Sequence, residues 1–335
     1  MHAPDRSAQP RARSAAGLRP ALGHRPPRPD GGFVTIALTG ATGFVGRALL
    51  DRAQDSEIVV RALARQPQRP RPLVEWVIGD LFNPPRLDQL MDSAETVVHV
   101  AGMVNGTPEE FEACNVTGTL NVIEAARRMG VPRIVFVSSL SAREPELSLY
   151  GASKARAEKL VMASGLDWTI VRPPAIYGWR DKEMLDLFKA AKWGLVPMPQ
   201  REGRASYIHV DDLARLLLRI APAAPGLNGR IYEPDDGREA GWGHREIAHA
   251  IGWAVGRRPA IVHLSPDWLK RVARWGQKLT RGKFKLTPDR AGYMAHPDWV
   301  VSPQGRVPAQ LWKPAIPTRE GLKDTAQWYR EQGWL

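Results

Sequence analysis

The stretch Gly40-Ala41-Thr42-Gly43-Phe44-Val45-Gly46 decides the fold of this chain. It follows an apolar run, Phe33 to Leu38, that is typical of a buried strand, and it leads into a sequence that favours a helix. A strand, a tight glycine turn and a helix start together form a cradle for a pyrophosphate group, because the free N–H groups of the first helical turn can face an anion. The spacing therefore predicts a cofactor site at this turn.

A second stretch, Tyr150-Gly151-Ala152-Ser153-Lys154, carries the candidate proton donor. Its phenol and ammonium groups are four residues apart and share one face of a predicted helix. A lysine in this position can lower the pKa of the tyrosine, and a tyrosine tuned in this way can pass a proton to a carbonyl oxygen. The cradle and the proton donor together predict hydride-transfer chemistry.

The composition narrows the class of protein. The chain has 335 residues, of which 43% are hydrophobic and 24% charged, as in ordinary soluble globular proteins. No apolar run approaches the ~18 residues that span a bilayer. Cys114 is the single cysteine, which excludes disulfides within the chain and indicates a reducing compartment such as the cytoplasm. No metal site is expected.

The net charge of +12 comes from two segments. Residues 1–32 contribute +4; they are rich in Pro, Arg and Ala, and we expect them to form a disordered extension. Their arginines also resemble a transit peptide, but the prolines argue against its amphipathic helix. Residues 257–290 contribute +8. A basic segment of this kind indicates a phosphate-bearing partner, either nucleic acid or an anionic membrane.

Strand-like and helix-like stretches alternate from residue 33 onward. This alternation predicts an α/β fold with a doubly wound parallel sheet and a smaller C-terminal unit. We expect an NAD(P)-binding Rossmann domain at 33–178, with 207–232 returning to it, and a substrate-binding region at 179–206 and 233–335. The predicted strands are 34–39, 58–63, 74–78, 97–100, 134–138 and 168–172, and the predicted helices are 46–53, 84–91, 109–129 and 150–164.

Eight ordered motifs resemble the extended short-chain dehydrogenase/reductase family, also described as the NAD-dependent epimerase/dehydratase family. They are Gly40-x-x-Gly43-x-x-Gly46, Gly79-Asp80-Leu81, His99-Val100-Ala101-Gly102, Asn115-Val116-x-Gly118-Thr119-x-Asn121, Val137-Ser138-Ser139, Tyr150-x-x-x-Lys154, Arg172-Pro173-Pro174 and His209-Val210-Asp211-Asp212.

The resemblance implies a role for each catalytic candidate. Tyr150 would be the proton donor in reduction, and Lys154 would lower its pKa and hold the nicotinamide ribose. Ser139 would hydrogen-bond the substrate oxygen, and Asn115 would position the lysine through water. The residues expected to bind the cofactor are Gly40, Thr42, Gly43, Phe44, Val45, Gly46, Arg65, Asp80, Leu81, Ala101, Gly102, Tyr150, Lys154 and Pro173.

Three polar residues of these motifs are interpreted as structural. We expect His99 and His209, which lie on or beside apolar runs, to be satisfied inside the fold. We expect Asp211 to cap the helix that follows it.

The end of the second strand bears on the choice of cofactor. The chain reads Leu63-Ala64-Arg65-Gln66, with no acid in the place where NAD-using relatives bind the ribose diol. A guanidinium can bind a 2′-phosphate that a carboxylate would repel. NADP(H) is therefore favoured over NAD(H), with Arg65 as the contact and Arg61 as a poorer candidate.

The segment Arg172-Pro173-Pro174-Ala175-Ile176-Tyr177-Gly178 bears on the substrate. Nucleotide-sugar epimerases usually carry an asparagine at the position of Ala175. The segment is similar instead to the 3β-hydroxysteroid dehydrogenase branch and to the reductase-like relatives of a complex I subunit. This favours an apolar, lipid-type ketone or alcohol of sterol, sphingoid or ceramide type. A nucleotide-sugar epimerase or dehydratase, and a non-catalytic subunit or assembly factor, remain the alternatives; homodimers are usual in the family.

A basic amphipathic helix is predicted at 265–281, capped by Ser265. Trp268, Val272, Trp275 and Leu279 share one face, with Leu269 beside them. The cations gather on the other face. Such a helix can lie in an anionic membrane interface through residues 265–285, or its apolar face can pack on its own domain. No recognition module accompanies the charge, so nucleic-acid binding is not expected. The cations are Lys270, Arg271, Arg274, Lys278 and Arg281.

Overall fold

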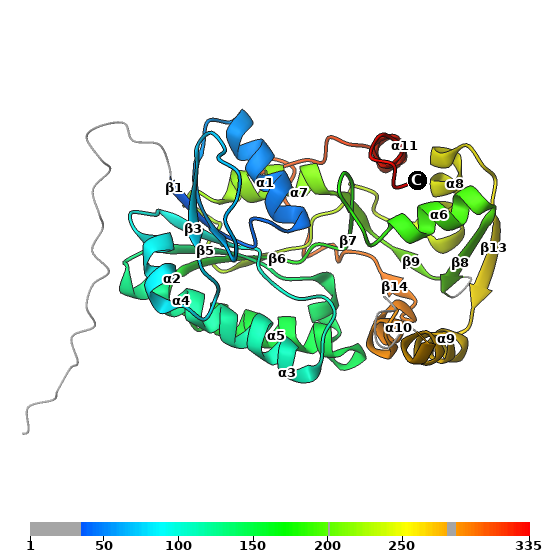
Figure 1. The fold of residues 1–335 in the computed structure, drawn as a ribbon, viewed down its shortest axis with the longest axis horizontal. Helices are drawn as coiled ribbons and strands as arrows, with labels where there is room; N and C mark the ends of the chain where they lie inside the picture. The colour runs from blue at the N-terminus through cyan, green and yellow to red at the C-terminus, as the bar shows by residue number, and fades with distance from the viewer. Residues whose placement is uncertain (1–34, 200–201, 280–285) are drawn as a thin grey trace, which may run out of the picture. The chain divides into compact units, whose positions relative to one another are not determined.

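Seven parallel strands form the central sheet, in the spatial order β11-β6-β5-β4-β1-β2-β3 (Figure 1). The structure is a computed structural model of the chain. It describes residues 35–199, 202–279 and 286–335. The predicted extension at 1–32 and the end of the basic segment at 280–285 lie outside these residues. The strands are β1 (Thr35–Thr39), β2 (Val59–Ala64), β3 (Val74–Ile78), β4 (Thr96–His99), β5 (Arg133–Val137), β6 (Asp167–Val171) and β11 (Arg230–Tyr232).

Helices cover both faces of this sheet (Figure 1). Successive side chains of a strand point to opposite faces, so Ile36 and Leu38 join the core under α1 and α7, whereas Ala37 joins the core under α2, α4 and α5. The doubly wound parallel sheet expected from the sequence is confirmed. The helices are α1 (Phe44–Asp55), α2 (Pro84–Met91), α4 (Gly118–Arg128), α5 (Leu149–Met162) and α7 (Val210–Ile220).

The helix predicted at 109–129 is not continuous. It consists of α3 (Pro108–Phe111), a π-helical segment η1 (Glu112–Thr117) and then α4. Residues that favour a helix do not reveal which hydrogen-bond ladder they adopt, and π-helical turns occur frequently at functional sites. This one contains Asn115, a predicted site residue.

The C-terminal region has a hydrophobic core of its own. Phe188, Ile251 and Tyr329 are buried in it, and they come from three helices that are far apart in sequence. Figure 1 shows this region beside the carboxyl-terminal part of the sheet. Its elements are β7 (Ala175–Tyr177), α6 (Leu185–Trp193), β8 (Leu195–Pro199), β9 (Arg204–Ala205), β10 (Tyr207–His209), β12 (Trp242–Gly243), α8 (His244–Val255), β13 (Ala260–Leu264), α9 (Pro266–Leu279), α10 (Pro288–Met294), β14 (Asp298–Trp299) and α11 (Thr318–Glu331).

Candidate active site

The glycine loop between β1 and α1 packs directly against the loop after β4. Gly40 has φ +72°, which favours glycine, and a Cβ built there would lie 2.6 Å from the main-chain nitrogen of Ala101. The Gly43 N–H donates to the Gly40 carbonyl at 3.0 Å, and a Cβ on Gly46 would overlap that carbonyl oxygen. The close backbone approach explains why this turn needs its glycines.

The amino end of α1 is open to an anion. Its N-cap is Gly43, no side chain caps it, and its first turn contains no acid. The first N–H groups of a helix have no partner inside the helix, and the dipole makes this end partly positive. The loop from Gly40 to Gly46 therefore fits a dinucleotide diphosphate, with Phe44 and Val45 in the first turn and Thr42 exposed beside it.

Arg65 lies just beyond β2, the strand next to β1, and is exposed. Arg61 is committed elsewhere, because its guanidinium donates to Glu75 at 2.8 Å and to the main-chain carbonyl of Asp92. Of the two arginines considered for a 2′-phosphate, Arg65 is the one whose side chain is not tied into a salt bridge with a neighbouring strand.

The remaining cofactor candidates follow β3, β4 and β6. The carboxylate of Asp80 accepts from the Phe82 N–H at 2.8 Å, and the carbonyl of Leu81 accepts from Asn121 at 2.8 Å. The Ala101 N–H donates to the Thr39 hydroxyl at 3.2 Å. These bonds hold the loops along the carboxyl edge of the sheet, where parallel sheets bind their ligands. Pro173 lies just past β6 and accepts from the Leu140 N–H at 2.9 Å.

Ser139 and Tyr150 are brought together at the start of α5. Ser148 caps this helix by accepting from the Gly151 N–H at 2.9 Å, which fixes Tyr150 in the first turn. Ser139 lies close enough to Tyr150 to act on the hydroxyl of the tyrosine, and it works to lower the pKa of Tyr150. The hydroxyl of Ser139 also accepts from Ser141, from the N–H at 3.2 Å and from the hydroxyl at 2.9 Å.

The pKa of Tyr150 departs from the sequence-based expectation. Burial raises it to about 12, while Ser139 and Arg290 act in the opposite direction. Arg290 is the cation that acts to lower this pKa in the structure, and the predicted effect of Lys154 on Tyr150 stays a prediction. The ammonium of Lys154 donates to the Val137 carbonyl at 3.0 Å.

Lys154 is itself strongly affected by its surroundings. Burial lowers its pKa to about 8, and Cys114 and Glu158 oppose that change. Its ammonium lies 4.9 Å from the centre of the Phe136 ring. A Cβ on Gly102 would lie 2.9 Å from the same nitrogen, so the loop after β4 closes directly over the lysine.

Asn115 links this loop to α5. Its side chain accepts from the Met103 N–H at 2.7 Å, donates to the Met103 carbonyl at 3.0 Å and donates to the Ser153 hydroxyl at 2.9 Å. Ser153 precedes Lys154, so Asn115 holds the loop after β4 against the helix that carries the lysine.

Glu158 was missed by the sequence analysis, although it lies one turn after Lys154 on the same helix face. It is buried and accepts from the Ser138 hydroxyl at 2.6 Å and from two nitrogens of Arg172 at 2.8 and 2.6 Å. A bidentate charge-assisted pair of this kind is strong and directional. It joins the ends of β5 and β6 to α5 and so aligns Ser139 with Tyr150.

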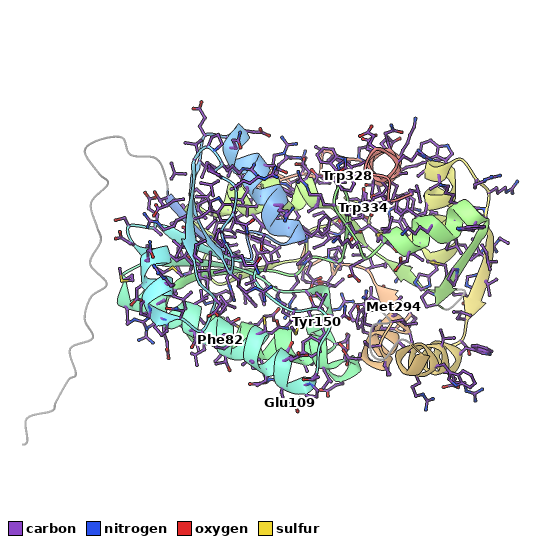
Figure 2. The ribbon with its side chains drawn as sticks, in the orientation of Figure 1. Phe82, Glu109, Tyr150, Met294, Trp328 and Trp334 are labelled. Atoms are coloured by element: carbon purple, nitrogen blue, oxygen red, sulfur yellow. The ribbon has the colours of Figure 1, made fainter. Side chains whose placement is uncertain are left out.

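Helix α10 supplies a second missed group. Asp289 accepts from the Leu149 N–H at 2.6 Å, which anchors α10 to the start of the catalytic helix. The ring of Tyr293 lies 6.4 Å from that of Tyr150, and Phe111 lies 6.2 Å from Tyr150. Figure 2 shows Tyr150 on the side of α5 nearest the helix that carries Met294. No local pattern in the sequence could reveal this contact.

Arg290 completes the group contributed by α10. Its guanidinium donates to Glu183 at 2.5 Å, and its charge acts to lower the pKa of Tyr293. Arg290 thereby places a positive charge near Tyr150, where it acts to lower the pKa of that tyrosine.

The two histidines are held by hydrogen bonds inside the fold. His99 is buried and bonded to Thr39 at 2.6 Å and to Thr119 at 3.0 Å, and burial lowers its pKa to about 3. His209 is the N-cap of α7 and accepts from the Asp211 N–H at 3.2 Å. The expected cap by Asp211 is therefore wrong: its carboxylate instead pairs with Arg52 on α1.

Among the described residues, no group of three or more His, Cys, Asp or Glu side chains is arranged to hold a metal ion.

Residues 36–233 match the sequence profile of the NAD dependent epimerase/dehydratase family. The chain belongs to this family. It is 37% identical to the ceramide reductase of Caulobacter vibrioides, over 90% of this chain and 96% of that protein. It is 29% identical to a 4-hydroxy-2-methyl-3-oxo-4-farnesyl-3,4-dihydroquinoline-1-oxide ketoreductase of Stigmatella aurantiaca, over 60% of this chain and 67% of that protein.

Solved structures agree on the fold. The Bordetella bronchiseptica enzyme WbmG, in complex with NAD, superposes with a TM-score of 0.70 at 18% identity, over 91% of this chain and 97% of that one. The family resemblance expected from the motifs is confirmed, and the chain is an NAD(P)-dependent oxidoreductase of this family.

Proposed function

We propose that this protein is an NADP(H)-dependent reductase of a ketone on an apolar, lipid-type substrate, or the reverse dehydrogenase, with Tyr150 as the proton donor. The observation that carries the proposal is the setting of Tyr150. Ser139 acts on its hydroxyl group to lower the pKa, and its ring lies near those of Phe111 and Tyr293. A polar pair beside aromatic rings suits a carbonyl attached to an apolar body.

The chemistry divides between the cofactor and the chain. A bound nicotinamide supplies the hydride that the carbonyl carbon accepts. Tyr150 gives its hydroxyl proton to the carbonyl oxygen, which becomes the alcohol, and Ser139 donates a hydrogen bond to that oxygen. Because burial raises the pKa of Tyr150 to about 12, the tyrosine is protonated at neutral pH, as reduction requires. The tyrosinate left behind regains its proton from solvent.

The side chain of Arg65 supports the preference for NADP(H). It is exposed just beyond β2, and no acid stands between Leu63 and Gln66 to repel a 2′-phosphate. A guanidinium can bind a phosphate through two parallel hydrogen bonds.

Two observations support a lipid-type substrate. Ala175, at the start of β7, has no amide with which to hold a nucleotide diphosphate. The relative from Caulobacter vibrioides is named a ceramide reductase, and we extend that substrate class to this chain as part of the proposal. A keto-ceramide, keto-sphingoid or keto-sterol would meet both conditions.

We also propose that the protein lies on the cytoplasmic face of a membrane, through α9. Trp268 and Trp275 on this helix are 57% and 72% exposed, whereas Ala273 faces the interior. At 100° per residue, Ala273 is about 140° round the helix from Trp268, so the tryptophan side is turned away from the packed side. Within the described part of the chain, no helix is both long and apolar enough to cross a bilayer. The side chains of Leu269, Lys270, Lys278 and Leu279, and the whole of 280–285, lie outside the described residues.

Cofactor titration tests the proposal first. Purified protein is titrated with NADPH and with NADH, following nicotinamide fluorescence, in the wild type, Arg65→Ala and the matched control Arg61→Ala. We expect tighter binding of NADPH that weakens roughly 10- to 100-fold in Arg65→Ala, the worth of charge-assisted hydrogen bonds. Arg61→Ala should keep the preference. Equal affinity for both cofactors would contradict the assignment of Arg65.

A substrate screen follows, with keto-ceramide, keto-sphingoid and keto-sterol in detergent and NADPH oxidation as the readout. NAD retained through purification, together with binding of a UDP-sugar, would instead support a nucleotide-sugar epimerase or dehydratase. Co-purification with a large membrane complex, with no turnover of any ketone, would support a non-catalytic subunit or assembly factor.

A further inference from the structure

We propose that the membrane-docking surface extends beyond α9 along the two-stranded sheet formed by β8 and β13, as far as Trp193, and that its partner is an anionic lipid bilayer. We call this added part the ribbon surface. It consists of Trp193, Leu195, Pro197, Ala260 and Val262.

The ribbon surface follows from strand alternation. Strands β8 and β13 are parallel, with Leu195 opposite Ala260 and Pro197 opposite Val262. Side chains of neighbouring strand residues point to opposite faces, so Val196 is buried while these four side chains are exposed. Neither β8 nor β13 contains an Asp, Glu, Lys or Arg. An exposed apolar sheet face of this kind is unusual on a soluble protein and marks an interaction site.

Trp193 provides the anchor at the far end of this surface. It is the last residue of α6 and its side chain is 89% exposed, so its indole contributes little to the stability of the fold. The next residue, Gly194, accepts from the Ala260 N–H at 2.8 Å and so fixes the end of α6 to the start of β13. Tryptophan is enriched at membrane–water interfaces because its apolar body carries a polar N–H.

The surrounding charge identifies the partner. Residues 185–199 and 257–279 contain eight Lys and Arg residues against two acids, Asp186 and Asp267. Lys189 and Lys192 are exposed on α6, as are Arg257 and Arg258 before β13. Protein interfaces are depleted of lysine, whereas cations beside an apolar surface are attracted to anionic lipids. The combination favours a bilayer over a protein partner.

The docking surface lies close to the catalytic tyrosine through α10. Strand β13 leads into α9, and α9 packs on α10 through Ala273 and Ala291. Helix α10 in turn places Tyr293 beside Tyr150. A lipid could therefore pass from the bilayer to Tyr150 along one helix. This delivery step rests on the proposed function, whereas docking itself does not.

Vesicle flotation of the full chain tests the docking surface. The vesicles are phosphatidylcholine alone or phosphatidylcholine with phosphatidylglycerol, each at low and high salt. The test variants are Trp193→Ala and the pair Leu195→Ser with Val262→Thr. The control is Trp179→Ala, which removes an exposed tryptophan that follows β7 and lies outside the ribbon surface. Thermal melting verifies that each variant folds as the wild type does.

We expect the wild type to bind the anionic vesicles only. Trp193→Ala and the ribbon pair should each weaken binding at least about fivefold through lost apolar insertion, and Trp179→Ala should bind as the wild type. Wild-type binding by folded Trp193→Ala and ribbon variants would overturn the extension, and so would equal binding to neutral vesicles.

A second measurement separates docking from catalysis. Reduction of a water-soluble ketone with NADPH, without vesicles, should be the same in wild type, Trp193→Ala and the ribbon pair. Turnover without vesicle binding would overturn docking and leave the reductase proposal standing. Vesicle binding without turnover of any ketone would overturn the reductase proposal and leave docking standing.

Discussion

The carboxyl edge of the central sheet differs from the surface formed by the ribbon surface and α9 in which side chains it buries and which it exposes. At the sheet edge, the buried charges Glu158 and Lys154 have partners within the chain: Glu158 pairs with Arg172, and Lys154 donates to the Val137 carbonyl. At the ribbon and α9, large apolar side chains such as Trp275 are exposed instead. The buried charges of the first region are therefore paired by residues of the same chain. The apolar side chains of the second region are exposed, and we propose that a lipid bilayer covers them.

The largest expected effect concerns the reaction at the sheet edge. Tyr150→Phe should lower kcat for ketone reduction by roughly 10²- to 10⁴-fold, because it removes the proton donor. NADPH affinity should stay nearly unchanged, since the phenyl ring still fills the site. Steady-state kinetics and fluorescence titration measure the two quantities. Tyr293→Phe, the matched control on α10, should retain most of the activity; equal losses in both variants would place the proton donor elsewhere.

The next largest expected effect concerns the free-energy cost of burying the charged side chain of Lys154. Because burial lowers the pKa of Lys154 to about 8 from 10.5, the unfolded chain holds this proton between those pH values while the folded chain does not. Raising the pH through that window therefore stabilises the fold, and below it the charged lysine carries a penalty of about 3 kcal/mol.

Lys154→Met should accordingly raise the free energy of unfolding at pH 7, by up to about 3 kcal/mol, while abolishing activity. Urea denaturation at pH 7 and pH 10 measures this, and the difference between variant and wild type should narrow at pH 10. A variant less stable than the wild type at both pH values would show that the hydrogen bond to Val137 outweighs the burial penalty.

The junction between the two regions is tested at Asp289. Asp289→Ala removes an acceptor from the Leu149 N–H at the start of the catalytic helix and should cost about 1–2 kcal/mol, as capping residues do. Asp267→Ala, an exposed acid in the first turn of α9, is the control and should cost less. Urea denaturation gives both values. Equal small losses would mean that α10 is not anchored through this carboxylate.

The smallest effect belongs to the exposed surface. Trp275→Ala should change the free energy of unfolding by no more than about 0.5 kcal/mol, as surface substitutions do. Phe188→Ala, in the buried core of the same region, should lose about 3–5 kcal/mol. Thermal and urea denaturation provide the comparison. A large loss in Trp275→Ala would show that its indole supports the fold and is not a free anchor.

The sequence by itself was sufficient for the doubly wound sheet, because strand and helix periodicities and glycine turns are local. It also placed Ser139, Tyr150 and the glycine loop at one edge, since the carboxyl ends of parallel strands meet there. The sequence did not predict the π-helical turn at Asn115 or the cap of α7 by His209, because several hydrogen-bond arrangements satisfy the same residues.

Only the tertiary structure decided which charges surround Tyr150 and which tryptophans are exposed. The four-residue spacing predicted that Lys154 acts on Tyr150, but it could not show that the ammonium donates to β5 or that Arg290, from a helix far along the chain, also acts on Tyr150. The amphipathic pattern of α9 was compatible with burial or exposure of Trp268. Both outcomes depend on packing between segments distant in sequence, and a local pattern carries no information about which distant segment will meet it.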